Sequence, residues 1–275
     1  MPGLFIAAIH NGELANSPAA IVVSQVEALF PGSRVQEVSQ QQGFEDLSDL
    51  VALREWSSRQ WVLERRWRNY LGRASRLRGL LARIGKQLWR VRVAYQAAFR
   101  DRAWRIRQVE AAVSRKHQAA WKDFLASDLD LVLLLESDAT WTPESAAGLS
   151  TAVELLTCKS PGYVNLAGGL SARELSIAHL RPSVSGAAPP GFLRYLPPVT
   201  NTSCAYLINR PMAELLLNQC RTHPTSSALG IDWLVNATFL EAQETRIEIE
   251  CWHADPPVLI HGSTTGVTKS WHPDR

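Results

Sequence analysis

The stretch Leu129-Asp130-Leu131-Val132-Leu133-Leu134-Leu135-Glu136-Ser137-Asp138 decides the fold. Its first part is almost wholly apolar, as is typical of strands that are buried on both faces of a parallel or mixed sheet. We therefore predict a buried strand over Leu129–Leu135. Glu136 and Asp138 follow that strand directly, and ligands of α/β proteins usually bind at strand ends.

The rest of the chain alternates between strand and helix patterns. Other strands are predicted at Leu4–Ile9, Arg34–Val38, Tyr163–Leu166, Ser203–Ile208 and, as an edge strand, Arg246–Trp252. Helices are predicted at Ala19–Leu29, Ala111–Phe124, after an N-cap at Thr142, from Asn209 to Leu217, and from Asp232 to Ala242. Such alternation predicts an α/β layer fold. The 275 residues fit one large domain or two small ones, and we predict a single domain, 1–275.

A basic segment interrupts this pattern. Arg54 to Lys122 holds 19 basic and 4 acidic residues, and its apolar residues follow heptad spacing from Leu63 to Ala98. We predict a long basic helical arm inserted at 50–122. It could pack on itself or on a second subunit as a homodimer, or bind a polyanion, either an anionic membrane surface or nucleic acid. The polyanion-binding candidates are Arg65, Arg66, Arg68, Arg73 and Arg76.

Composition excludes several classes of protein. The chain has a net charge of +3 and is 46% hydrophobic, as ordinary globular proteins are. Neither a membrane span nor a secretory signal pattern is visible. The four cysteines form no CxxC pair, which disfavours a zinc site or a disulfide framework. We expect a cytoplasmic location, peripheral on the inner membrane face if the arm binds lipid.

Two carboxylates at the end of a buried strand suit a divalent cation. One could bind the ion directly while the other supports it or contacts the ribose of a donor. Mg²⁺ and Mn²⁺ prefer such oxygen ligands and keep coordination positions for phosphate oxygens. A solvated acidic turn explains the same residues, so the triplet Glu136-Ser137-Asp138 leaves both interpretations open.

The order of several motifs resembles glycosyltransferase family 25, the lipopolysaccharide-biosynthesis type. Those enzymes carry an apolar strand that ends in Glu-Asp-Asp, here Glu136-Ser137-Asp138. The stretch from Thr200 to Arg210 is similar to the family's Thr-x-Ala-Tyr-Leu-Ile-Ser-Arg motif, and Gly230-Ile231-Asp232 falls where the family has Pro-Val-Asp. Pro256 to Ser263 resembles its closing Pro-Pro-Leu-Val motif.

The resemblance covers roughly 113–270 and implies a GT-A-like sheet flanked by helices, a UDP-sugar donor and Mn²⁺ or Mg²⁺. Two features depart from the family pattern. Ser137 replaces the middle acid, and the usual N-terminal Ile-Asn-Leu run with paired arginines is missing. The basic arm is also foreign to the family.

The resemblance also suggests roles for single residues. Asp232 would be the general base of an inverting transfer, although an N-cap explains it equally well. His261 would complete a metal site with Glu136 and Asp138, although a lone histidine is more often a packed residue. The donor-binding candidates are Ile9, His10, Asn165, Ser263 and Lys269.

These observations predict a metal-dependent glycosyltransferase that moves a hexose from a nucleotide sugar, UDP-glucose or UDP-galactose, to a hydroxyl acceptor. The expected acceptor is a cell-surface glycan or lipopolysaccharide precursor. Two alternatives remain open: a phage-type enzyme that glycosylates hydroxymethylated DNA bases, and a non-catalytic polyanion-binding protein with a transferase-like fold.

Overall fold

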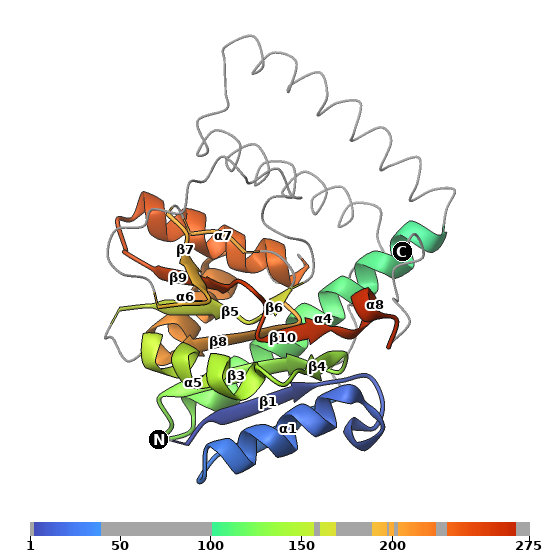
Figure 1. Ribbon diagram of the computed structural model, residues 1–275. Helices are drawn as coiled ribbons and strands as arrows, with labels where there is room; N and C mark the ends of the chain where they lie inside the picture. Colours follow the sequence, from blue (N-terminus) through green and yellow to red (C-terminus); the bar gives the residue numbers. More distant parts are fainter. Residues whose placement is uncertain are drawn as a thin grey trace.

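The computed structural model describes residues 3–39, 101–156, 160–168, 189–196, 198–200, 203–223 and 230–267. Within these ranges the chain forms a mixed α/β fold with a seven-stranded sheet flanked by helices, which confirms the predicted α/β layer fold. In Figure 1 the strands rise from β1 near the bottom, through β3, β8 and β5, to β9 and β7 near the top. The predicted arm from residue 50 to 100 lies outside the described residues.

The helices and strands follow in alternation. The strands are β1 (Phe5–Ile9), β2 (Arg34–Val38), β3 (Leu131–Glu136), β4 (Ala139–Trp141), β5 (Gly162–Asn165), β6 (Ala167–Gly168), β7 (Phe192–Arg194), β8 (Ala205–Asn209), β9 (Glu250–Ala254) and β10 (Leu259–His261). The helices are η1 (Leu14–Asn16, a 3-10 helix), α1 (Pro18–Leu29), α4 (Asp101–Leu125), α5 (Ser145–Leu155), α6 (Arg210–Thr222), α7 (Ile231–Glu244) and α8 (Gly262–Thr265).

The large sheet has the strand order β2-β1-β3-β8-β5-β9-β7. β1 is parallel to both β2 and β3, whereas β8 is antiparallel to its neighbours β3 and β5. The chain leaves β1 through α1 to reach β2, and it returns through α4 to β3 on the other side of β1. The strand order therefore reverses between β1 and β3, and open α/β sheets bind ligands beyond the carboxyl ends of strands at such a point.

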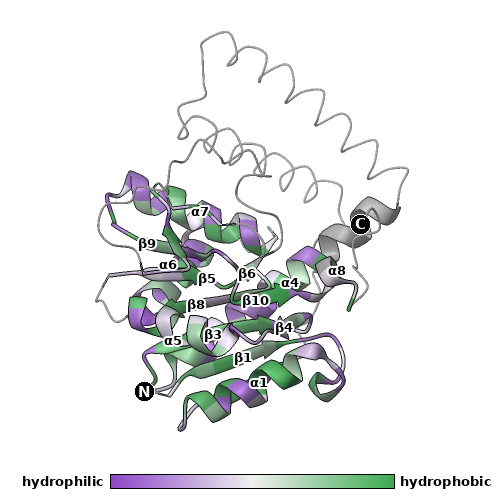
Figure 2. Ribbon diagram, in the orientation of Figure 1, coloured by the Kyte–Doolittle hydropathy of each residue, from purple (hydrophilic) through white to green (hydrophobic). Residues whose placement is uncertain are grey.

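Two hydrophobic clusters cover the two faces of the sheet. On one face Val132 and Leu134 of β3 pack with Trp121 of α4 and with residues of α6 and α7. On the other face Leu131, Leu133 and Leu135 pack with residues of α1 and α5. Alternate residues of β3 thus serve opposite faces, as the two-residue period of a strand requires. Figure 2 shows hydrophobic residues along β1, β3 and α1.

A second, smaller sheet with the order β4-β10-β6 lies beyond β3. In it His261 pairs with Ala139, and the Gly262 N–H donates to the Asp138 carbonyl at 2.7 Å. The Ser145 hydroxyl donates to the Val258 carbonyl at 2.5 Å, which ties α5 to the segment before β10. These contacts fix the end of β10 beside the turn that follows β3.

Several predicted boundaries need correction. β9 is not an edge strand, because it lies between β5 and β7, and it begins at Glu250 rather than Arg246. Thr142 is not an N-cap: α5 begins at Ser145, and it is the Ser145 hydroxyl that accepts a hydrogen bond from the Thr142 N–H. By contrast, the Asn209 side chain does cap α6, since it accepts from the Met212 N–H at 3.2 Å.

The carboxyl-terminal part of the predicted arm belongs to the core. α4 extends to Leu125, and Ala111, Ala120 and Trp121 on it are completely buried. The apolar residues of this stretch pack against the sheet, so the segment from 111 to 122 is part of the α/β layer. Trp121, which falls within the predicted arm 50–122, is a core residue.

Candidate functional site

The carboxyl ends of the parallel strands form one edge of the large sheet. Ile9 at the end of β1 pairs with Glu136 at the end of β3, and Asn165 ends β5. The antiparallel strand β8 begins at this edge, because its Ala205 pairs with Leu135. Side chains that follow β1, β3 and β5, or precede β8, therefore converge there.

Asp138, Cys204 and His261 form a group that could hold a metal ion, since one ligand atom from each lies within 4.8 Å of the others. The Asp138 Oδ2 atom lies 3.2 Å from His261 Nδ1. The Cys204 thiol donates to Asp138 Oδ1 across 3.3 Å. Cys204 is buried, whereas the Asp138 and His261 side chains are each 21% exposed, so the group is open to solvent on one side.

Glu136 lies outside this group and faces α4. By strand alternation its side chain continues the row of Val132 and Leu134, and its Oε1 atom lies 3.2 Å from His117 Nε2. The predicted ligand set of Glu136, Asp138 and His261 is thus divided in the structure. Asp138 and His261 meet each other and Cys204, while Glu136 meets a histidine of α4.

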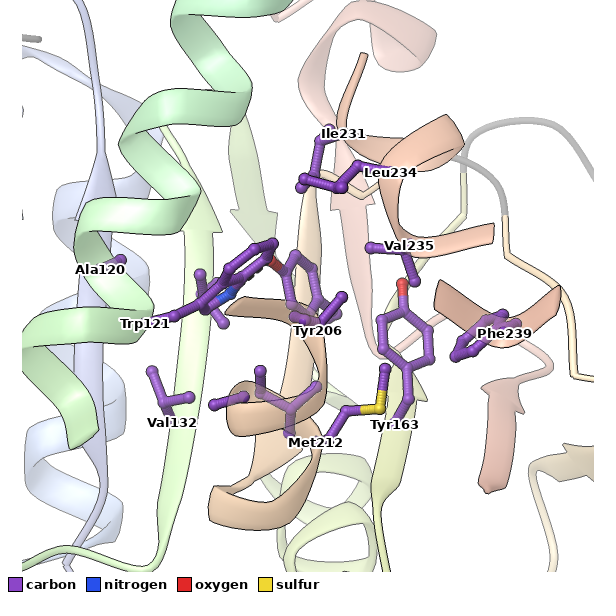
Figure 3. Close-up of a cluster of buried hydrophobic side chains, with 14 of the residues drawn as sticks. Ala120, Trp121, Val132, Tyr163, Tyr206, Met212, Ile231, Leu234, Val235 and Phe239 are labelled. Atoms are coloured by element: carbon purple, nitrogen blue, oxygen red, sulfur yellow. Dashed lines mark hydrogen bonds between the residues drawn. The ribbon is translucent and has the colours of Figure 1, made fainter. Parts of the chain in front are cut away.

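His117 connects Glu136 to a buried chain of hydrogen bonds. The Trp121 Nε1–H donates to the Tyr206 hydroxyl at 3.2 Å, and that hydroxyl lies 2.8 Å from His117 Nδ1. Figure 3 shows the indole of Trp121 beside the Tyr206 ring. Because indole can only donate, every donor finds an acceptor if Tyr206 donates to Nδ1 and His117 donates from Nε2 to Glu136. This series of hydrogen bonds therefore fixes a neutral His117 with its proton on Nε2.

Burial controls the protonation of both ends of this contact. It lowers the pKa of His117 to about 3, so the imidazole is neutral at physiological pH. Burial, together with the charges of Asp138 and Asp232, raises the pKa of the Glu136 carboxyl to about 8. Glu136 can then hold a proton in the cation-free protein near neutral pH while it still accepts from His117.

Asp232 approaches the same edge from α7. It lies in the first turn of that helix, but its side chain does not cap the helix, because Gly230 is at the N-cap position. The Ser203 hydroxyl instead donates to Asp232 Oδ1. The Asp232 charge acts on Glu136, His117 and Cys204. The prediction of an N-cap is therefore wrong, and the carboxylate belongs to the site.

The end of β1 contacts a buried lysine of α4. The Lys116 ammonium donates to the His10 carbonyl at 2.6 Å and to Asn11 Oδ1 at 2.5 Å. Burial lowers the pKa of Lys116, and the nearby Glu136 opposes that shift. Lys116 thus places a cation at the point where the strand order reverses.

The predicted donor-binding residues have different surroundings. The Ile9 side chain packs in the core on the α4 face, which leaves only its backbone for a ligand. The His10 ring is buried, with Nε2 3.2 Å from Glu37 Oε2. Asn165 donates to Thr200 Oγ1 and accepts from the Ala167 N–H, so it holds the turn after β5.

Other predicted residues are only partly placed. Ser263 lies in α8, directly after the end of β10. Lys269 and the five arm arginines Arg65, Arg66, Arg68, Arg73 and Arg76 lie outside the described residues. Their predicted roles in donor and polyanion binding stay predictions.

Sequence reasoning missed Cys204, Ser203, His117 and Lys116. Ser203 and Cys204 are the first residues of the predicted strand Ser203–Ile208, and an antiparallel placement of that strand would have brought them to the carboxyl edge of the sheet. His117 lies four residues before Trp121, a spacing that puts both on one face of a helix. No local signal marks Lys116, because it stands in a strongly basic stretch.

A comparison with protein-family models and with curated proteins gave no match. Among the helices that the structure describes, none is long and apolar enough to cross a membrane.

Proposed function

We propose that the chain is a divalent-cation-dependent, inverting glycosyltransferase that moves a hexose from a nucleotide sugar to a hydroxyl acceptor. The observation that supports this most is the meeting of Asp138, Cys204 and His261 at the carboxyl edge of the sheet, beside Asp232 and Glu136. Metal ligands and further carboxylates are the groups that this transfer needs. The motif order that resembles family 25 gives the reaction class, with UDP-glucose or UDP-galactose as donor and a surface-glycan precursor as acceptor.

The metal ligands and Asp232 would have different roles in the reaction. A bound cation would neutralise the charge that develops on the leaving diphosphate. Asp232 would take the proton of the acceptor hydroxyl while that oxygen attacks the anomeric carbon. The bond from that carbon to the diphosphate oxygen breaks as the new glycosidic bond forms. Ser203 orients the Asp232 carboxylate through its hydrogen bond.

Glu136 would contact hydroxyl groups of the donor. Its Oε1 atom accepts from His117, which leaves its other oxygen for a ligand at the edge of the sheet. The buried chain behind His117 holds this carboxyl in one orientation. Lys116 of α4, which donates to the His10 carbonyl after β1, would add positive charge near the donor nucleotide.

The test is a panel of nucleotide sugars, assayed for hydrolysis and for transfer with and without added divalent cations. Turnover of a UDP-hexose that requires a cation is expected. Asp138→Asn should lower it by on the order of 10³-fold, since Lewis-acid stabilisation is worth several kcal/mol. Asp130→Asn is the matched control, because Asp130 precedes the opposite end of the same strand. Cation-independent turnover, or equal activity of both variants, would refute the proposal.

A further inference from the structure

The group of Asp138, Cys204 and His261 contains a sulfur atom, which influences the choice of cation. We propose that Asp138, Cys204 and His261 are a three-ligand site for a borderline cation such as Zn²⁺ or Co²⁺, in preference to Mg²⁺ or Mn²⁺. The part of this proposal that concerns catalysis rests on the proposed function. The binding itself does not.

The spacing of the ligand atoms suits a small tetrahedral ion. Zinc bonds of about 2.0–2.3 Å to oxygen, nitrogen and sulfur place tetrahedral ligands roughly 3.3–3.6 Å from one another. Asp138 Oδ2 lies 3.2 Å from His261 Nδ1, and Asp138 Oδ1 lies 3.3 Å from Cys204 Sγ, so each separation is close to that range. One ligand atom from each residue lies within 4.8 Å of the other two, so a single ion can bind all three once these atoms move closer together.

The backbone holds all three residues in place. The Glu136 N–H donates to the Cys204 carbonyl at 2.8 Å, and the Gly262 N–H donates to the Asp138 carbonyl at 2.7 Å. His261 is paired with Ala139 across β10 and β4. A site built on paired strands is preorganised, so binding requires little ordering of the chain.

The ligand types select the ion. Thiolate and imidazole favour zinc and related transition metals, whereas Mg²⁺ and Mn²⁺ favour oxygen donors. Three protein ligands with an open fourth position are typical of catalytic zinc sites, in which the open position takes water or substrate. The partial exposure of Asp138 and His261 supplies that open side.

Without a cation, the Cys204 thiol keeps its proton and donates it to Asp138. A bound cation replaces that proton, which passes to the solvent, because a coordinating thiol is deprotonated. The alternative is that Asp138 is only a hydrogen-bond acceptor shared by a thiol and an imidazole. The two cases differ in whether a cation binds to sulfur.

The experiment adds Co²⁺ alone to purified, chelator-treated full-length protein and follows the absorption spectrum. We expect one Co²⁺ per chain, with a sulfur-to-cobalt charge-transfer band that Zn²⁺ abolishes by displacement and that equal Mg²⁺ or Mn²⁺ does not. Cys204→Ser should remove the band and weaken zinc binding by at least ~100-fold, more than the loss of an outer-shell contact costs. Cys220→Ser on α6 is the matched control and should keep both.

Bound cobalt without the band, or Cys204→Ser with unchanged zinc affinity, would overturn the proposal. Because no nucleotide sugar is present, the result is independent of the transferase assay. If the band forms but no donor turns over with any cation, the metal site stands and the proposed function fails. If Mg²⁺ or Mn²⁺ supports full turnover in Cys204→Ser, the proposed function stands and the choice of cation is wrong.

Discussion

The two faces of the sheet differ in what they bury beside β3. On the α1 side the cluster around Leu131, Leu133 and Leu135 consists mainly of aliphatic side chains. On the α4 side the core includes Tyr206 and Trp121, whose polar atoms lead through His117 to Glu136. The two faces of β3 therefore serve different purposes. The α1 side supplies packing energy, and the α4 side also orients the Glu136 carboxyl at the carboxyl edge of the sheet.

The division continues beyond the strand. Glu136 keeps to the α4 side, where a hydrogen-bonded histidine sets its orientation. Asp138, only two residues later, turns towards β10 and Cys204, a member of the cluster on the α1 side. The turn at 137–138 thus separates two acids that sequence alone would assign to one ion.

The largest effect is expected for Asp232→Asn. This variant tests whether a residue on the α4 side of the sheet, where α7 packs, acts as the general base. Turnover should fall by about 10²–10⁴-fold, because the amide cannot accept the acceptor's proton. Donor affinity should stay nearly constant. Steady-state and donor-binding measurements separate the two quantities, with Ser203→Ala as the milder control. A collapse of donor affinity with unchanged turnover would make Asp232 a binding residue.

On the aliphatic side, Leu133→Ala should lower the free energy of unfolding by about 2–5 kcal/mol, since it opens a cavity in a completely buried position. Denaturant unfolding measures that change. Cation binding and turnover per folded molecule should remain unaltered. A loss of cation affinity comparable to that of Asp138→Asn would show that the two faces are not separable.

On the polar side, Tyr206→Phe should cost about 1–3 kcal/mol, because it leaves the Trp121 indole and His117 Nδ1 without their partner. Without the Tyr206 hydroxyl, the His117 proton should no longer be confined to Nε2. Nitrogen-15 NMR of the imidazole would report the proton on Nε2 in the wild type and a mixture in the variant. A single unchanged tautomer would contradict the fixed hydrogen-bond chain.

The last effect concerns the stability of the cation-free protein against pH. The Glu136 pKa is about 8 in the folded state against an ordinary 4.5, so the folded state holds an extra proton between these values. Its contribution is complete below about pH 4.5 and is lost as pH rises towards 8. Relative to wild type, Glu136→Gln should gain roughly 4 kcal/mol between pH 5 and pH 9, because each pH unit between 5 and 8 contributes about 1.4 kcal/mol. Thermal melts in chelator check this, and a constant difference across that range would contradict the raised pKa.

The sequence pattern was sufficient for the main layers. The apolar run before Glu136 correctly predicts a buried central strand, and the Asn209-Arg210-Pro211 signal correctly places the start of α6. These elements depend on local periodicity and capping. Each is set by residues close together in the chain.

Long-range pairing was beyond such patterns. β4, β6 and β10 have only two or three residues each, too few for any periodicity, yet β10 brings His261 to Asp138. Cys204 reaches the site only because β8 pairs antiparallel with β3. The separation of Glu136 from Asp138 depends on His117, a residue that the basic composition of its surroundings had assigned to the arm.

The order of Asp138, Cys204 and His261, the proposed metal ligands, along the chain has a consequence for biosynthesis. Asp138 and Cys204 leave the ribosome well before His261, and His261 is held by a strand that must insert between β4 and β6. A nascent chain can complete the large sheet's β3–β8 pairing while it still lacks the third ligand. Metal capture at full affinity would then follow translation of β10, so the cell would load this protein after synthesis of the site and not during it.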